Sequence, residues 1–265
     1  MLPANNEDDM SYEECTDDLN RVCSDLANCV GDTAVALSRI ADGGNVFEVK
    51  AGYAKEMVTA FIRVDGVTVG AVANRTEVYD EDGNVAEKFD AVLTPAGCYK
   101  AADFVNFCDA FSIPVLSLTN VKGFKADKCA EKKIAHAAAK LTYAFANATV
   151  PKVNVIIGQA YGSAYVAMNS KAIGADITIA WPDAEIGTMD AKLAAKIMCD
   201  GKGADEIDAC AKEYAALAGS AQSAAARGYV DQIVAPEDTR KYIIGAFEML
   251  FTKREDRPTK KHGTV

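Results

Sequence analysis

The stretch VNVIIGQAYGSAYVAM, residues 153–168, carries the sharpest change of pattern in the chain. Its start, Val153–Ile157, is apolar and mostly β-branched, which predicts a buried strand. Gly158–Gly162 predicts a turn, and Ser163–Ile173 predicts a short helix. A strand, a turn bounded by glycines and a helix in immediate succession are typical of an α/β protein.

The same alternation of strand and helix patterns extends along the chain on both sides. Two alternating apolar runs around Asp65-Gly66 predict a β-hairpin over residues 57–73. The other predicted strands are Ile113–Leu118, Ile177–Trp181 and Gln232–Val234, and the predicted helices are Asp17–Asn28, Thr33–Ile40, Ala101–Phe111, Glu131–Ala148, Ala191–Cys199, Ala204–Ala218, Ala221–Arg227 and Thr239–Phe251. With no strong repeat and no low-complexity linker, this pattern favours a single α/β domain over residues 1–265, with a polar lead-in (1–20) and a basic tail (253–265).

The composition limits the partners and the compartment. Acidic residues outnumber basic ones 38 to 28, giving a formal charge of −10. Such a surface repels nucleic-acid phosphates and anionic lipid, so we expect neither nucleic acid nor membrane as a partner. No run approaches the roughly 18 apolar residues of a membrane span, and the acidic N-terminus has the wrong polarity for a signal peptide. We therefore expect a cytoplasmic protein.

The chain offers few ligands for a metal ion. Its eight cysteines form no CxxC pair, and it has only two histidines, so we expect no zinc or other catalytic metal. Scattered cysteines without a signal peptide indicate reduced thiols. Nothing in the local sequence favours a nucleophilic pair between a cysteine and His136.

Two glycine-containing segments at predicted strand ends could carry chemistry through the backbone. After Gly162, the start of a helix would present the free N–H groups of Ser163 and Ala164. Free N–H groups at a helix start stabilise an oxyanion. Asn120–Phe124 follows another strand, and Gly123 again permits close backbone approach. The plainer interpretation is that the glycines only allow tight turns. Because charged groups are scarce in both segments, backbone dipoles fit better than a side-chain triad.

Several stretches, in order along the chain, are similar to one enzyme family. They are LPANN (2–6), ADGGNVFEV (41–49), VGAVAN (69–74), AKLTYAFANATVPK (139–152), AYGSAY (160–165), AWPDAEI (180–186), GYVD (228–231), PEDTR (236–240) and KKHG (260–263). The chain resembles the C-terminal half of biotin-dependent acyl-CoA carboxyltransferase β subunits, of the propionyl-CoA carboxylase and transcarboxylase kind. The resemblance implies a crotonase-like superhelix of ββα units.

The resemblance also implies a cofactor, partners and residue roles. Biotin, on a separate carrier protein, would bind this half, and acyl-CoA would bind a separate N-terminal half. The implied partners are that half, the biotin carboxyl carrier protein and biotin carboxylase, in a hexamer-type assembly. Because biotin itself takes the substrate proton in such enzymes, no protein base is required. The roles carried over are a backbone oxyanion hole at Gly162, Ser163 and Ala164, and a cofactor pocket with Gly123, Phe124, Tyr161, Tyr165 and Val166.

The chain departs from the family pattern at the same two segments. Ser163 replaces the second glycine of a usual pair, and Lys122 stands where proline is usual. The segment 124–133 lacks the family's glycines. Three alternatives therefore remain open beside a carboxyltransferase subunit. They are a decarboxylase subunit that runs the same chemistry backwards, a scaffold half with weakened catalysis, and a free-standing hydratase or isomerase.

Overall fold

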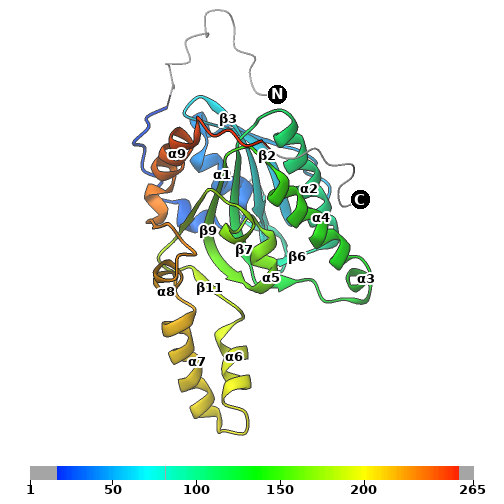
Figure 1. Cartoon of the computed structure of the whole chain (residues 1–265), viewed down its shortest axis with the longest axis vertical. Coiled ribbons are helices and arrows are strands. Elements are labelled where there is room, and N and C mark those ends of the chain that lie inside the picture. Colours follow the sequence, from blue (N-terminus) through cyan, green and yellow to red (C-terminus); the bar gives the residue numbers. More distant parts are fainter. Residues whose placement is uncertain (1–16, 81, 257–265) are drawn as a thin grey trace, which may run out of the picture.

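An eight-stranded sheet runs through the protein, which the computed structural model describes for residues 17–80 and 82–256 (Figure 1). The strand order is β1-β2-β3-β7-β9-β10-β12, and β11 pairs with a later part of β9. The first three strands are antiparallel, and every pair from β3 onward is parallel. The strands are β1 (Val46–Glu48), β2 (Met57–Val64), β3 (Val67–Asn74), β7 (Val115–Val121), β9 (Lys152–Tyr161), β10 (Ile177–Ala180), β11 (Glu185–Gly187) and β12 (Gln232–Ile233).

Helices cover both faces of this sheet and produce three layers. One face packs against α2 (Pro95–Ala110), α4 (Ile134–Asn147), α5 (Gly162–Ala167) and α8 (Ala221–Ala226). The other face packs against α1 (Thr33–Ile40) and α9 (Thr239–Leu250). Successive residues of the strands serve opposite faces, as Leu116 and Val115 of β7 do. The sheet core is therefore buried on both sides, as parallel strands require.

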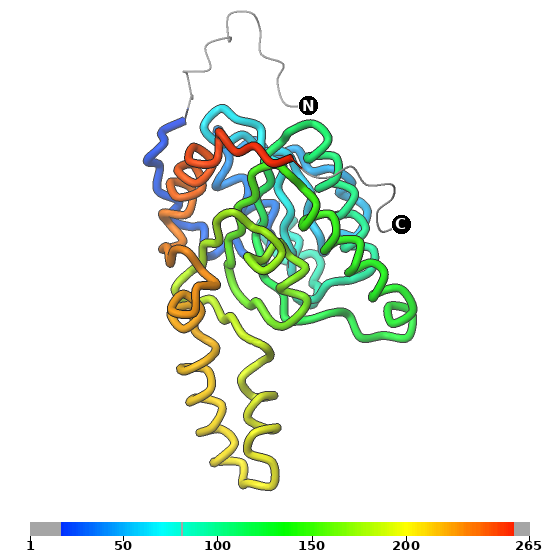
Figure 2. The backbone as a smooth tube through the Cα atoms, viewed as in Figure 1, coloured from blue at the N-terminus to red at the C-terminus, as the bar shows by residue number. Residues whose placement is uncertain are grey.

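Two smaller sheets and a helical hairpin extend from this core. β4 (Glu77–Tyr79) pairs with β5 (Val85–Lys88), and β6 (Val92–Leu93) pairs with β8 (Gly123–Phe124). Figure 2 shows the hairpin of α6 (Ala191–Met198) and α7 (Ala204–Ala218) projecting away from the sheet. The remaining helical segments are α3 (Lys128–Glu131) and the 3-10 turns Leu26–Cys29, Asp42–Gly44, Lys171–Ile173 and Pro236–Asp238.

The sequence predictions for the hairpin, for the later parallel strands and for most helices are confirmed, and one predicted helix is wrong. Asp17–Asn28 is helical only as the 3-10 turn Leu26–Cys29. The carboxylate of Asp17 accepts hydrogen bonds from Arg21 Nε at 3.1 Å and from the Gly43 amide at 3.2 Å. Next to it, Oδ1 of Asp18 accepts a hydrogen bond of 2.9 Å from the amide of Asn20, and this local bond favours a turn because it competes with helical backbone pairing.

Several predicted boundaries also differ. The helix predicted to begin at Ala101 begins at Pro95, where the Thr94 side chain caps it by accepting from the Gly97 amide, and the strand predicted as Ile113–Leu118 runs over Val115–Val121. Glu131–Ala148 is broken, because Lys133 leaves the helical region (φ −124°) between α3 and α4. The predicted turn Gly158–Gly162 is strand as far as Tyr161, because β9 gains a partner, β11, that the sequence did not reveal. The helix predicted to end at Ile173 ends at Ala167, and a 3-10 turn follows. The lead-in up to residue 16 and the tail from residue 257 lie outside the described residues.

Candidate functional site

The junction between β9 and α5 contains the first candidate donors. Tyr161 ends the strand in an extended conformation (φ −115°, ψ 136°), and Gly162 begins the helix with a φ of +58°. No side chain caps this helix start. Ser163 is exposed, whereas Ala164 is buried. The first amides of a helix have no partner within the helix, so their N–H groups are available to an acceptor.

Gly162 is required at this junction for two reasons. Its φ of +58° lies in the left-handed region, which side chains with a Cβ adopt only at a cost of about 1–2 kcal/mol. In addition, a Cβ built on Gly162 would lie 3.1 Å from the carbonyl oxygen of Thr188. That contact is tighter than an ordinary van der Waals distance, and its partner is backbone. Glycine therefore fixes how closely the chain after β11 approaches the start of α5.

The second candidate donor lies at the end of the neighbouring strand. After Val121, the chain leaves the main sheet, and Gly123 and Phe124 pair with Val92 and Leu93 of β6. β8 contacts α5 directly. A Cβ built on Gly123 would meet no atom within 4 Å, so the backbone there faces open space. Because β7 and β9 are adjacent and parallel, the structure gathers both candidate segments at one edge of the sheet.

A cavity of about 470 Å³ opens beside the start of α5. Of the predicted site residues, it is lined by Gly162, Tyr165 and Val166. Tyr161 lines an adjacent cavity of about 250 Å³. Neither cavity is lined by Ser163, Ala164, Gly123 or Phe124. These four residues lie in α5, which borders the larger of the two cavities, and in β8, which contacts α5. The structure therefore brings the predicted residues to one region in two groups.

Several residues that line the larger of these two cavities were not predicted. Thr188 follows β11, Tyr214 lies on α7, and Lys171, Arg227 and Tyr229 approach from the far side. They come from four separate segments. No spacing in the sequence relates them to Gly162, because the fold alone brings them together.

Near the cavity, two tyrosines are held neutral, a lysine is paired with an aspartate, and an arginine keeps its positive charge. Burial raises the pKa of Tyr165 to about 12. Burial, and then a hydrogen bond donated by its hydroxyl to Glu185, raises the pKa of Tyr161. Lys171 forms an ion pair with Asp231. Arg227 donates to the carbonyl of Leu217 at 3.4 Å. Arg227 keeps its positive charge, so the groups that could bind a developing negative charge here are the backbone amides and this guanidinium.

Thiol and metal chemistry have little support in the described part of the chain. Burial raises the pKa of both Cys98 and Cys108 to about 12, which keeps them protonated. His136 Nδ1 shares a hydrogen bond of 2.8 Å with the Tyr99 hydroxyl. Within residues 17–80 and 82–256, no group of three or more His, Cys, Asp and Glu side chains could hold a metal ion. No helix of these residues combines the length and hydropathy of a membrane span.

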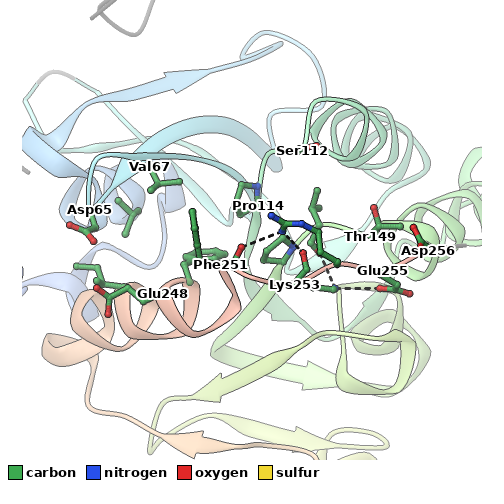
Figure 3. A pocket seen from close by; sticks show the side chains of 16 residues that line it. Asp65, Val67, Ser112, Pro114, Thr149, Glu248, Phe251, Lys253, Glu255 and Asp256 are labelled. Atoms are coloured by element: carbon green, nitrogen blue, oxygen red, sulfur yellow. Dashed lines mark hydrogen bonds and ion pairs between the residues drawn. The ribbon is translucent and has the colours of Figure 1, made fainter. Parts of the chain in front are cut away.

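A larger cavity, of about 800 Å³, lies at the opposite edge of the sheet (Figure 3). It is bounded by the β2–β3 turn, by the segments that precede β7 and β9, and by the end of α9. Pro114 and Pro151, just before the two parallel strands, place it at their amino ends. None of the predicted site residues lines it.

Comparisons with known proteins point to one family. The family described as the carboxyl transferase domain matches residues 1–265. The chain is 41% identical to the methylmalonyl-CoA carboxyltransferase 12S subunit of Propionibacterium freudenreichii subsp. shermanii, over 99% of this chain and 51% of that protein. It is 37% identical to the methylmalonyl-CoA decarboxylase subunit alpha of Propionigenium modestum, over 100% of this chain and 52% of that protein. The chain therefore spans about half the length of these curated relatives.

A solved structure gives the same result for the fold. The transcarboxylase 12S crystal structure, described as a hexamer assembly with hydrolyzed methylmalonyl-coenzyme A bound, superimposes with a TM-score of 0.84. The sequence identity is 40%, over 93% of this chain and 48% of that one. The expectation of an α/β, crotonase-like fold is thus confirmed.

Proposed function

The chain belongs to the carboxyl transferase domain family, and from that premise we propose that it is the biotin-facing half of a biotin-dependent acyl-CoA carboxyltransferase. The observation that carries this proposal is the junction at Gly162. There, a left-handed glycine begins an uncapped helix at the mouth of a cavity, in a family that transfers carboxyl groups. Tyr165 is held neutral and Lys171 is paired with Asp231, which supports the backbone amides of this helix start as the donors that we propose for the chemistry.

The residues fit the flat ureido ring of biotin. Gly162 and Gly123 leave the backbone uncovered where a Cβ would stand in the way, and Tyr165 and Val166 supply an apolar wall. When bound, biotin supplies the exchanged carboxyl group and the ring nitrogen that accepts the substrate proton. The amides of Ser163 and Ala164 would hold the ureido oxygen of bound biotin through hydrogen bonds, which would stabilise negative charge on that oxygen. Gly123 and Phe124 would line the same site, and the hydrogen bond that the Tyr161 hydroxyl donates to Glu185 holds the end of β9.

The partners follow from the half-length match. We propose that an N-terminal half binds acyl-CoA and completes the active site. We also propose that a biotin carboxyl carrier protein and biotin carboxylase deliver the carboxyl group. Relatives named for methylmalonyl-CoA favour methylmalonyl- and propionyl-CoA as substrates, and the hexamer named for the solved relative favours a hexamer-type assembly. The described cysteines are all free, which supports a reducing, cytoplasmic compartment.

A decarboxylase subunit is the second candidate, since the decarboxylase of Propionigenium modestum is 37% identical to this chain. The same amides would serve the reaction in either direction.

A scaffold half with weakened catalysis is the alternative suggested by Lys122, which stands where the family usually has proline. Its amide donates to the carbonyl of Ala91 at 2.8 Å, and its side chain pairs with Asp90 at 3.5 Å. Both contacts keep the segment folded beside α5, so they favour a competent site.

The test is carboxyl transfer by the chain alone and by the chain combined with its acyl-CoA-binding half. Purified chain with free biotin is expected to leave methylmalonyl-CoA unchanged, because the acyl-CoA site is missing. The combined protein is expected to release propionyl-CoA only when biotin is added. Steady decarboxylation by the chain alone, or an assembled complex inert toward malonyl- and methylmalonyl-CoA, would contradict the proposal.

A further inference from the structure

The pairing of β7 with β9 is interrupted just before the two candidate segments. Thr119 lies opposite Ile156, and the next pair joins Val121 to Ala160. Between these pairs, Asn120 alone stands opposite the run 157–159 of β9. Irregular pairing of this kind bends a strand, redirects the residues beyond it, and is common beside active sites.

The side chain of Asn120 fills this irregularity. Its Oδ1 accepts a hydrogen bond of 3.0 Å from the amide of Gln159, a group that regular pairing would otherwise satisfy. The amide of Asn120 in turn faces Oδ1 of Asn74, at the end of β3, at 3.5 Å. Asn120 therefore joins the carboxyl ends of three adjacent strands, and it is half-buried there.

Gly158 makes room for this side chain. A Cβ built on Gly158 would lie 2.7 Å from Oδ1 of Asn120 and 3.0 Å from its Cγ. The three atoms nearest to that Cβ all belong to the Asn120 side chain. Gly158 does not have a positive φ, so its backbone would accept alanine. The glycine is thus required by Asn120 and by no other nearby group.

Each strand reaches one candidate segment directly after this contact. β7 continues from Asn120 through Val121 to Gly123, where it pairs with β6. β9 continues from Gln159 to Gly162, held on its other side by β11. The hydrogen bond between Asn120 and Gln159 joins the two strands inside the irregularity, just before Val121 and Ala160 resume pairing. Together with that pair, it sets how far apart the two backbone segments lie.

We propose that Asn120 is a positioning residue that fixes the spacing between the backbone donors after Gly162 and those at Gly123. Gly158, which has no Cβ, leaves the space that the Asn120 side chain occupies. The inference rests on the proposed function, since it assigns those donors to one reaction. A misplacement of about 1 Å can cost roughly 100-fold in rate. Loss of the contact between Asn120 and Gln159 should therefore lower turnover while the pocket that binds substrate persists.

The experiment is a double-mutant cycle in the assembled complex, the chain with its acyl-CoA-binding half. Asn120→Ala removes the acceptor, and Gly158→Ala displaces the Asn120 side chain from Gln159. We expect each to lower kcat about 10- to 100-fold, with KM for methylmalonyl-CoA changed less than about threefold. The double variant should be no slower than the single ones, because both act through one contact. Gly52→Ala is the matched control, since a Cβ there meets no atom within 4 Å.

Each outcome is decisive. An active wild-type complex whose Asn120→Ala variant keeps its kcat would overturn the positioning role alone. Losses of kcat that multiply in the double variant would also overturn it. So would losses of kcat that match the fraction of folded complex measured by thermal melting, because a purely structural role would give that result. A wild-type complex that assembles but transfers no carboxyl group would overturn the proposed function, and the positioning role with it.

Discussion

The two ends of the parallel strands β7 and β9 differ in what surrounds them. The amino ends border the larger cavity, of about 800 Å³, and the carboxyl ends border one of about 470 Å³. At the amino ends, Lys253 lies in the wall of the larger cavity (Figure 3). Its ammonium group donates to the carbonyl of Val150 at 3.1 Å and to Asp176 at 2.9 Å. At the carboxyl ends, the backbone turns sharply at Gly162 and exposes amides.

The site that we propose therefore lies at the smaller of these two cavities. In open α/β sheets, ligands bind outside the carboxyl ends of the strands, where loops and helix starts present backbone donors. The amino ends carry side-chain pairs that hold α9 and its tail against the sheet. We therefore expect variants at the carboxyl ends to change turnover and variants at the amino ends to change stability.

The largest effect is expected from Gly162→Val at the carboxyl ends. The new Cβ would press on the carbonyl of Thr188 and would need a left-handed conformation that valine avoids. The amides of Ser163 and Ala164 would move off line, and losing one oxyanion donor costs about 10²–10³ in rate. The kcat of the assembled complex should fall by at least this factor.

Circular dichroism of the same variant separates misdirected amides from unfolding. The strain of about 1–2 kcal/mol is smaller than the 5–15 kcal/mol that stabilises a typical domain, so the variant should remain folded. An unfolded protein would show that Gly162 only permits the turn. A folded and fully active complex would contradict both interpretations.

The next effect is expected at the amino ends, from Lys253→Met. The change removes the cation beside Asp176, whose carboxylate also accepts from the Lys152 amide at 2.8 Å. Leaving a partly buried acceptor without this partner costs about 1–3 kcal/mol. At about 2–4 °C per kcal/mol for a chain of this size, the melting temperature should fall by several degrees. The kcat of the assembled complex should not change, and a lower kcat at an unchanged melting temperature would place function at this end as well.

The sequence predicted the carboxyl ends better than the amino ends, for a physical reason. The pattern VNVIIGQAYGSAYVAM marks a strand, a glycine and a helix by local preference alone, and all three are present. The limits of β9 were wrong because Gln159–Tyr161 becomes strand only through pairing with β11, which is distant in sequence. The conformational preferences of neighbouring residues do not predict which distant strand will pair with a segment.

The wall of the cavity beside α5 shows the same limit of sequence-based prediction. Tyr165 and Val166 were predicted through the family resemblance of the segment that contains them, and both line the cavity. Thr188, Tyr214 and Arg227 come from segments that only the folded chain brings together. The contact between Asn120 and Gly158 was missed as well, since a half-buried asparagine and a glycine are unremarkable in either segment alone.

A smaller effect is expected from Val166, on substrate preference. Val166 is half-buried and lines the cavity beside Gly162. One methylene in an apolar pocket changes binding by roughly 1–3 kcal/mol, which is a factor of about ten or more. Val166→Ile and Val166→Asp should each shift the ratio of kcat/KM for acetyl-CoA and propionyl-CoA. A ratio that neither variant moves would place this side chain outside the pocket that binds substrate.

The smallest effect is expected from Ser163→Gly. The side chain of Ser163 is exposed and does not cap the helix, so the proposed role belongs to its amide, which glycine retains. Glycine costs a few tenths of a kcal/mol more than serine in a helix, and less at its first turn, so stability should hardly change. The kcat should stay within about twofold, because the amide to which we assign the role is retained. A hundredfold loss would show that the hydroxyl, rather than the backbone, contacts the reacting groups, and the carboxyl ends would then act through side chains.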